Sequence, residues 1–271
     1  MGLSMNRFRS FAKAVVIQTL KAFGRPSSGL RSNWVRMQLA KKHLRGTGIE
    51  IGAMHNPLRV PKTARVEYLD VTTREENIRK FPDLDPQALV NVDYLANGFL
   101  MDGIASSSFD FVIANHVLEH ASNPVDALVQ WFRVLKPGGI LYCALPRMDI
   151  TFDKGRKLTT AAHMMEDYQF CGDHNRAQMR ERNLDHYREW LSIAIPAHTG
   201  QPPPKPDLLA VQIGEYADRE EEIHFHTFTM ASALELLREL AKSVLPQMTV
   251  VQALDARAEI LLILKKSPTP Q

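Results

Sequence analysis

The stretch that decides the fold is Gly48–Asp70, which reads GIEIGAMHNPLRVPKTARVEYLD. It predicts a buried strand, a tight turn at Gly52 and a second strand that ends on a carboxylate. In nucleotide-binding α/β folds, an acidic residue about twenty positions after the first strand binds the diol of a ribose. We therefore expect Glu50 and Asp70 at the carboxyl ends of neighbouring parallel strands, where such sheets bind their ligands.

The turn after Gly52 differs from a dinucleotide site. Met54 occupies the position of the second fingerprint glycine, whose lack of a side chain lets the backbone approach a pyrophosphate, and this argues against NAD or FAD. Pro57 and Pro61 interrupt the connection and leave little room for a helix whose amino terminus could bind a phosphate. A ligand with a ribose and no pyrophosphate fits best, and S-adenosylmethionine is the common one.

Two later runs carry a resemblance to a known family. SFDFVIANHVLEH, residues 108–120, reads as a buried strand with a polar end, and LKPGGILY, residues 135–142, as a helix end, a turn and a strand. Together with the first turn and Asp70, they resemble the motifs of class I S-adenosylmethionine-dependent methyltransferases, in the same order. The bacterial methyltransferase type 11-like subgroup is the most similar. The motifs lie within about residues 48–146, and the last helix and strands of the family would match residues 229–265.

The resemblance implies a Rossmann-like, doubly wound α/β fold with a mostly parallel sheet and an antiparallel last strand. It implies S-adenosyl-L-methionine as the cofactor. The side chains and turns that would bind it follow the ends of the strands: Glu50, Ile51, Gly52, Ala53, Asp70, Asn97, Asn115 and His116. An amide at Asn97 could both donate to and accept from an adenine edge. The alternative for this residue is a plain Asn-Gly turn.

The composition indicates a soluble globular protein. The chain has 271 residues, of which 45% are hydrophobic, enough for a sizeable core in one large domain or two small ones. Cys143 and Cys171 offer neither a disulfide framework nor a metal-binding spacing. No apolar run reaches the roughly 18 residues that span a bilayer. We expect a cytoplasmic protein.

The charge is distributed unevenly along the chain. Ten Lys and Arg residues precede Glu50, and no Asp or Glu does. Within this basic part, residues 5–23 predict an amphipathic helix, which could lie in a membrane interface and bring the protein to a membrane surface. The alternative is that it packs on the domain or frays as a terminus.

The chain divides into four segments. We expect a basic helical extension over residues 1–46, an S-adenosylmethionine-binding core over 47–146, a lid and acceptor insertion over 147–228, and a closing helix and strands over 229–271. In the first part of the chain we further expect a loop at 25–29, a helix from Asn33 to about Leu44, and a capping box at Thr72 or Thr73. In the core we expect a strand at 90–95 and a turn at 136–139 before a strand at 140–145. Beyond it we expect helices near 160–170 and 175–191, a loop at 201–206, a helix capped by Thr229, and strands at 248–254 and 258–264.

Methyl transfer from a sulfonium mainly requires alignment of the acceptor, and a hydroxyl acceptor also requires a base. Asp149, Asp153 and His224 are the candidate catalytic residues, with His116 and His226 as further candidate bases. His224 and His226 would point to one face of an extended segment, which suits a metal. No third ligand can be placed from the sequence, and we therefore predict no metal.

The function predicted from these observations is methyl transfer to a small-molecule or glycan acceptor, at oxygen. Met54 and the missing first helix motivate an alternative, a non-catalytic S-adenosylmethionine-binding partner or scaffold protein. The basic start motivates a nucleic-acid methyltransferase. That reading lacks an Asn-Pro-Pro-Tyr-type motif and interleaved aromatic residues, and nucleic acid is therefore not the expected partner.

Overall fold

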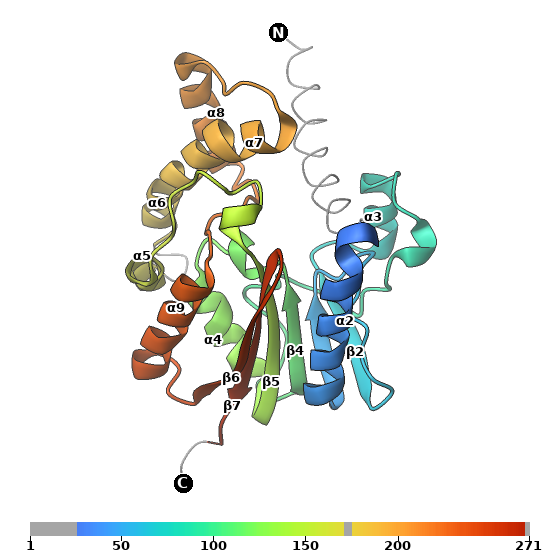
Figure 1. Cartoon of the computed structure of the whole chain (residues 1–271). Coiled ribbons are helices and arrows are strands. Elements are labelled where there is room, and N and C mark those ends of the chain that lie inside the picture. The colour runs from blue at the N-terminus through green and yellow to red at the C-terminus, as the bar shows by residue number, and fades with distance from the viewer. Residues whose placement is uncertain (1–25, 171–174, 269–271) are drawn as a thin grey trace.

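A computed structural model of the chain describes residues 26–170 and 175–268 (Figure 1). Its centre is a seven-stranded sheet with the order β3-β2-β1-β4-β5-β7-β6. The first five strands pair in parallel, and β7 runs antiparallel to both β5 and β6. The strands are β1 (Gly46–Ile51), β2 (Ala64–Asp70), β3 (Tyr94–Leu95), β4 (Phe109–Asn115), β5 (Leu135–Pro146), β6 (Met248–Ala256) and β7 (Glu259–Lys266). The predicted fold class is confirmed.

Helices cover both faces of this sheet. The helices are α2 (Pro26–His43), α3 (Arg74–Lys80), α4 (Pro124–Val134), α5 (Ala161–Asp167), α6 (Arg176–Glu189), α7 (Ile195–Thr199), α8 (Pro206–Asp218) and α9 (Met230–Ser243). A π-helical turn, Trp190–Ala194, joins α6 to α7. Within the described part of the chain, no helix has both the length and the apolar character needed to cross a membrane.

The alternation of side chains along β4 explains the two layers. Val112 and Ala114 belong to a core cluster shared with α4, α5 and α9, whereas Phe111 and Ile113 belong to a cluster shared with α2. All four are buried, as expected for a central parallel strand that is covered on both faces. The nearly continuous apolar run of this strand follows from that position.

The segment between β5 and α9 forms helices of its own. Figure 1 shows α5–α8 beside and beyond the ends of the strands, on the side where the parallel strands finish. A separate hydrophobic cluster holds part of this segment together, with Tyr187, Trp190, Ile213 and Phe225 among its members. This segment contains the stretch predicted to be a lid, and it lies near the sheet edge at which such folds bind ligands.

Local signals in the sequence explain most helix starts. Thr73 accepts a hydrogen bond from the backbone of Glu76 and closes a capping box with it, so the second of the two predicted boxes is the one formed. Asn123 caps α4 with Pro124 in the first turn. Thr160 caps α5 and Thr229 caps α9. These side-chain acceptors satisfy backbone N–H groups that a helix start leaves without partners.

The first described helix begins earlier than predicted. The sequence suggested a loop at 25–29 and a helix from Asn33, whereas α2 begins at Pro26. Proline fits the first turn of a helix because the N–H that it lacks has no partner there. The predicted helix over residues 5–23 lies outside the described residues.

Two strands differ in length from the prediction. The strand expected at 90–95 is only Tyr94–Leu95, because the carboxylate of Asp93 accepts the hydrogen bond from Tyr68 N at 2.8 Å in place of a strand partner. The turn expected at 136–139 is instead an irregularity within β5, where Gly138 has a φ of +84° and the pairing with β4 shifts register. Helix α8 was not predicted, since its first residue, Pro206, reads as part of a proline-rich loop.

Candidate active site

Gly52 makes an open turn at the carboxyl end of β1. Its φ is +63°, in the left-handed region that favours glycine, and no atom lies within 4 Å of the place that a Cβ would take. The N–H of Gly52 donates to Leu69 O at 2.9 Å, which continues the pairing of β1 with β2. The turn is exposed, and it therefore leaves room for a ligand at this edge of the sheet.

The connection from β1 to β2 contains no helix, as the two prolines predicted. Asn56 N donates to Ala53 O at 3.0 Å and closes a tight turn, within which Met54 has a φ of +46°. A side chain at positive φ is uncommon. The backbone here adopts the conformation that glycine favours, although methionine occupies the position. Such local strain gathers at ligand sites.

The buried side chain of Glu50 binds the backbone of this loop. Its side chain is 1% exposed and accepts hydrogen bonds from Leu58 N at 3.0 and 3.1 Å and from Asn115 Nδ2 at 3.3 Å. Burial raises the pKa of Glu50 to about 7, against the opposing effect of the two donors. The carboxyl group therefore joins the loop to the end of β4, and its direct contact with a cofactor stays a prediction.

Asp70 ends β2 and is half-buried. Its Oδ1 accepts from the N and the Oγ1 of Thr72, each at 3.2 Å, and its Oδ2 accepts from Asn77 Nδ2 at 3.5 Å. These bonds hold the carboxylate at the end of the strand. Since a carboxylate has about four acceptor positions, it can still accept from the hydroxyl groups of a ribose.

The turn that follows β3 is shaped by Asn97, which accepts hydrogen bonds within it, and by Ile51, which packs against it. The side-chain oxygen of Asn97 accepts from Phe99 N at 2.8 Å and from Leu100 N at 3.2 Å, so only its NH₂ group is left to offer a ligand. A Cβ on Gly98 would come within 2.4 Å of Ile51 Cγ2, which explains the glycine. The Asn-Gly turn considered in the sequence is present. The adenine contact stays a prediction.

Asn115 presents a buried acceptor at the end of β4. Its amide nitrogen donates to Glu50, whereas its Oδ1 is buried and has no hydrogen-bond partner within residues 26–170 and 175–268. A buried acceptor without a partner costs free energy unless a ligand satisfies it. An ammonium group would do so.

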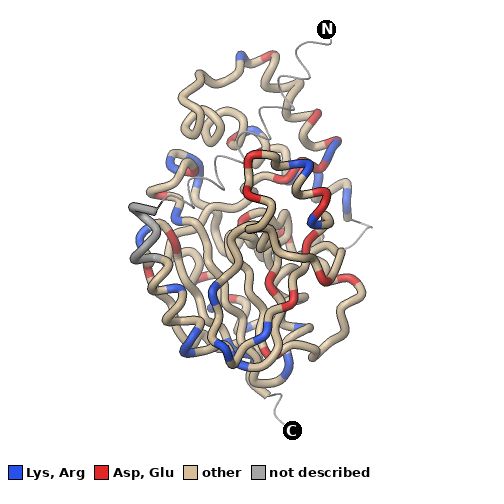
Figure 2. The backbone as a smooth tube through the Cα atoms, turned by 90° about the vertical axis from the view of Figure 1, so that its right-hand side faces the viewer, with Lys and Arg blue, Asp and Glu red and all other residues tan. Residues whose placement is uncertain are grey.

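The residues at this edge fit S-adenosylmethionine. The ribose diol would donate to Asp70, and the amino group of the methionine part would donate to Asn115. Gly52 leaves the space between β1 and β2 open. Figure 2 shows Asp and Glu mixed with Lys and Arg in the upper part of the molecule, and mainly Lys and Arg toward the end that carries the C-terminus.

A second, buried group of charges lies across β4, β5 and β7. Arg36 of α2 donates through Nε to Glu259 Oε2 at 2.9 Å and through Nη2 to Oε1 at 2.5 Å. His116 Nε2 lies 2.7 Å from the same Oε1, and His116 Nδ1 lies 3.5 Å from Glu119 Oε1. We call Arg36, Glu259, His116 and Glu119 the charged network.

His116 is held as a cation within the charged network. Burial lowers the pKa of its imidazole, but Glu119 and Glu259 outweigh that effect and raise it. Its φ is +57°, a further strained position at this edge. An imidazolium between two carboxylates has no lone pair to offer, which argues against His116 as a base. Its predicted contact with the cofactor is untested.

Asp153 and His224 form a buried pair next to the charged network. His224 Nδ1 lies 2.8 Å from Asp153 Oδ2, and Arg156 Nη1 donates to Asp153 Oδ1 at 2.8 Å. Burial raises the pKa of Asp153, and the interactions with His224 and Arg156 outweigh this effect, so the net change in the pKa of Asp153 is downward. Two of the three predicted catalytic residues are therefore brought together.

Asp149 lies apart from this pair. Arg147 donates to its carboxylate through Nη2 at 2.6 Å and Nε at 3.1 Å, and the Asp149 side chain is 48% exposed. His224 and His226 also lie in different groups of side chains. His224 belongs to a group with Glu119 and His120, whereas His226 belongs to a group with His163 and His186.

The sequence did not single out the remaining charged residues of the site. Glu119 is fully buried. The spacing of His116, Glu119 and His120 places them on one turn after β4, which was the available signal. Arg36 and Glu259 are 223 positions apart, and no local sequence pattern predicts that they pair.

The chain is similar to several known proteins. Residues 46–143 match the methyltransferase 11 family, a methyltransferase domain. No curated protein matches the chain. An S-adenosylmethionine-dependent methyltransferase from Aquifex aeolicus is similar at 12% identity over 92% of this chain and 97% of its own, with a TM-score of 0.48. One from Thermotoga maritima has 14% identity over 95% and 99%, with a TM-score of 0.46.

A proposed Zn-dependent alcohol dehydrogenase from Rhodobacter sphaeroides has 17% identity over 90% of this chain and 92% of its own, with a TM-score of 0.51. At this identity the likeness concerns the α/β fold alone. The match over residues 46–143 is the finding that concerns chemistry.

Proposed function

We propose that the chain is a class I S-adenosylmethionine-dependent methyltransferase and that it methylates a hydroxyl group of a small-molecule or glycan acceptor. The match over residues 46–143 and the strand order support this proposal. When bound, the cofactor supplies a methyl group on a sulfonium, which is a good leaving group. The residues of the chain then have three tasks: to align the acceptor, to exclude water and to take up the hydroxyl proton.

The observation that carries the proposal is the pair of His224 and Asp153. A carboxylate 2.8 Å from Nδ1 selects the tautomer with hydrogen on Nδ1, which leaves a lone pair on Nε2. No hydrogen bond to Nε2 is found among the described residues. Nε2 can therefore accept the proton of an acceptor hydroxyl. We assign His224 as the base and Asp153 as the residue that orients it.

Arg156 fixes this pair in place. Its guanidinium donates to Asp153 Oδ1 and to the carbonyl oxygens of His224 and Phe225, at 2.7–3.0 Å. One buried cation thus joins the loop after β5 to the segment that leads into α9. The arrangement is formed before any substrate binds, which lowers the reorganisation that the reaction requires.

Aromatic rings surround His224 and suit the proposed acceptors. The ring centroid of Phe152 lies 4.8 Å from that of His224, and that of Trp190 lies 5.6 Å from it. Such rings exclude water from the base. They also offer a surface to an acceptor with an apolar face next to its hydroxyl, as sugars and small aromatic metabolites have. We propose that the insertion over 147–228 forms the acceptor site.

The experiment is a measurement of S-adenosylhomocysteine release from the full chain, with sugars, nucleotide sugars and phenols offered as acceptors. We expect turnover with a hydroxyl acceptor, a methyl ether as product, and loss of turnover in His224→Gln with cofactor binding retained. A product methylated at nitrogen or carbon, or wild-type turnover by His224→Gln, would overturn the proposal.

Location and membrane contact are separate proposals. The basic amphipathic segment over residues 5–23 supports a peripheral contact with an anionic membrane from the cytoplasmic side. Sedimentation of the full chain with phosphatidylserine vesicles, compared with a chain that begins at residue 26, tests this contact.

A further inference from the structure

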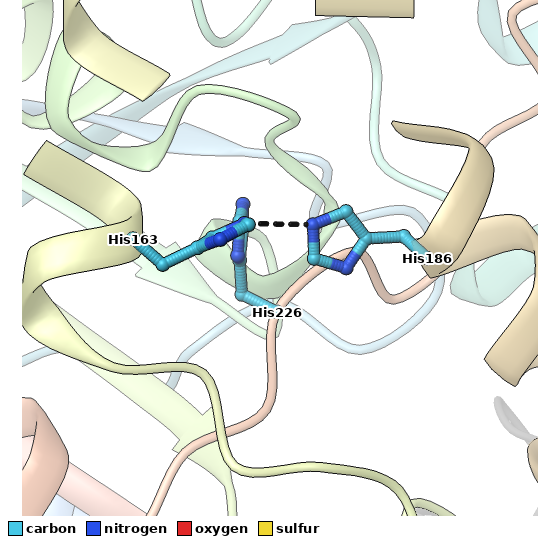
Figure 3. A group of neighbouring side chains, drawn as sticks. All are labelled: His163, His186 and His226. Atoms are coloured by element: carbon cyan, nitrogen blue, oxygen red, sulfur yellow. Dashed lines mark hydrogen bonds between the residues drawn. The ribbon is translucent and has the colours of Figure 1, made fainter. Parts of the chain in front are cut away.

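Three histidines from separate parts of the insertion meet at one point (Figure 3). His163 comes from α5, His186 from α6 and His226 from the segment before α9. One ring nitrogen from each lies within 4.8 Å of the other two. The Nε2 atoms of His163 and His186 are 3.1 Å apart. We call these residues the histidine cluster.

A carboxylate completes the histidine cluster. Asp167 Oδ2 lies 3.4 Å from His163 Nε2 and 3.9 Å from His226 Nε2, and it has no hydrogen-bond partner among the described residues. The Asp167 side chain is 2% exposed. Its other oxygen, Oδ1, accepts from Arg182, and Asn123 donates to its backbone carbonyl. Arg182 therefore binds one oxygen of the carboxylate, Oδ1, and the other oxygen, Oδ2, lies toward the histidines.

His226 also has a nitrogen without a partner. The residue is fully buried; its Nε2 lies 3.4 Å from Ser122 O, and its Nδ1 is not hydrogen-bonded within the described part of the chain. A buried nitrogen and a buried carboxylate oxygen, both unsatisfied and both near His163, form a costly arrangement unless something binds between them.

We propose that the histidine cluster and Asp167 bind a zinc ion. Zinc is held by imidazole nitrogens and carboxylate oxygens in tetrahedral sites, with bonds of about 2.0–2.2 Å that place the ligand atoms about 3.3 Å apart. The separations of 3.1 Å between the two Nε2 atoms and 3.4 Å between Nε2 and Oδ2 agree with that value. The contact of Arg182 with Asp167 Oδ1 is of the kind that orients a ligating carboxylate.

The protonation states suit the metal. Burial, followed by the neighbouring His163, lowers the pKa of His186 to about 3. Burial and the other two histidines also lower the pKa of His226 well below its ordinary value. Both imidazoles are neutral at pH 7, and the neutral form is the one that binds metals.

The ion would join three elements that no disulfide or shared strand connects. It would hold α5 and α6 of the insertion against the segment before α9. The ligand in that segment, His226, lies two positions after the proposed base His224. The role of the ion is therefore to hold separate parts of the insertion together. This inference concerns residues outside the proposed chemistry and does not depend on the acceptor.

The test is metal binding by the full chain after removal of metals with a chelator. Calorimetry with Zn²⁺ should give one site per chain. Titration with Co²⁺ should produce the visible absorption of a four-coordinate ion. His163→Ala and His186→Ala should each weaken binding more than about 100-fold. His43→Ala is the matched control, because His43 is a part-buried histidine bonded to Gln252 elsewhere.

His120→Ala separates the histidine cluster from the second group of possible ligands, Glu119, His120 and His224. It should bind Zn²⁺ like the wild type. The proposal is overturned if the wild type shows no saturable binding, if the two cluster variants bind like the wild type, or if His120→Ala loses the ion instead. The side chain of His163 is 34% exposed, so its variant is decisive if His186→Ala fails to fold.

Discussion

The carboxyl edge of the sheet has two halves that are built in different ways. In the half at β1 and β2, Gly52 is open and Asp70 bonds to residues two and seven positions away. In the half at β4, β5 and β7, buried charges pair over long separations, 223 positions for Arg36 with Glu259 and 71 for His224 with Asp153. The first half relies on contacts between near neighbours in the sequence, whereas the second relies on pairs that join distant parts of the chain.

The difference matches the two tasks that the proposed methyl transfer requires. A cofactor has to enter and leave, so the residues that bind it keep acceptor capacity facing outward. A base has to be oriented before the acceptor arrives, so its partners are buried and fixed. Each prediction below changes one half and asks whether the other is affected.

The largest effect should follow from Asp153→Asn. The amide cannot hold His224 in the tautomer that leaves Nε2 basic, and turnover should fall about 10³–10⁴-fold. Asp149→Asn, four residues away and on the surface, is the matched control and should retain wild-type turnover. Steady-state kinetics of both variants measures this, with cofactor binding by calorimetry unchanged. Equal losses in the two variants would contradict the assignment.

Glu259→Gln should destabilise the fold without touching the cofactor half. It leaves Arg36 and His116 buried without their shared carboxylate, at a cost of about 3–5 kcal/mol in the free energy of unfolding. Asp255→Asn, on the neighbouring strand, removes an exposed partner of Arg147 and should cost less than about 1 kcal/mol. Urea unfolding at pH 7 compares the two. A small loss in Glu259→Gln would show that the charged network is not what holds α2 to β7.

Asp70→Asn should weaken S-adenosylmethionine binding about 100-fold, since bonds from the ribose hydroxyls to a charged acceptor are lost. Glu67→Gln, on the same strand, is the control, because Glu67 accepts from Tyr94 Oη at 2.8 Å and has no assigned ligand contact. Calorimetry gives both dissociation constants. If the Asp70 and Glu67 variants bind alike, Asp70 is not in the site.

The last prediction is a pH dependence of the stability, caused by Glu50. Its pKa is raised by burial to about 7 in the folded chain, from 4.5. The folded chain therefore holds a proton that the unfolded chain releases between these values. The free energy of unfolding should fall by about 1.4 kcal/mol per pH unit as the pH rises through this window. Above pH 7 the contribution is constant.

The matched variant for this prediction is Glu50→Gln, which cannot titrate. Unfolding by urea at several pH values from 5 to 8 should show a steeper decline for the wild type than for the variant up to about pH 7. Parallel curves would mean that Glu50 is charged in the folded chain throughout.

The sequence predicted the features of the fold that depend on residues close to one another in the chain. The strand and turn at Gly52, the caps at Thr73 and Thr229, and the closing strands all depend on signals within a few positions. The strand order follows from the family resemblance, because the motifs of one fold appear in one order.

The rest depends on contacts between distant parts of the chain. Asp153 and Asp149 look alike in the sequence, and only the packing of the insertion buries the first and leaves the second on the surface. His224 and His226 are two positions apart, and helices α5 and α6 decide which group each joins. The partners of His226 in the proposed zinc site, His163 and His186, lie on two separate helices, so the sequence could not place them.

A crystal structure of the chain with S-adenosylhomocysteine tests the central claim most directly. The account predicts ribose hydroxyls within hydrogen-bond distance of the Asp70 carboxylate and the amino group of the ligand on Asn115 Oδ1, beside the open face of Gly52. A nucleoside bound elsewhere, or a turn at residues 53–56 folded across Gly52 with the ligand excluded, would contradict it.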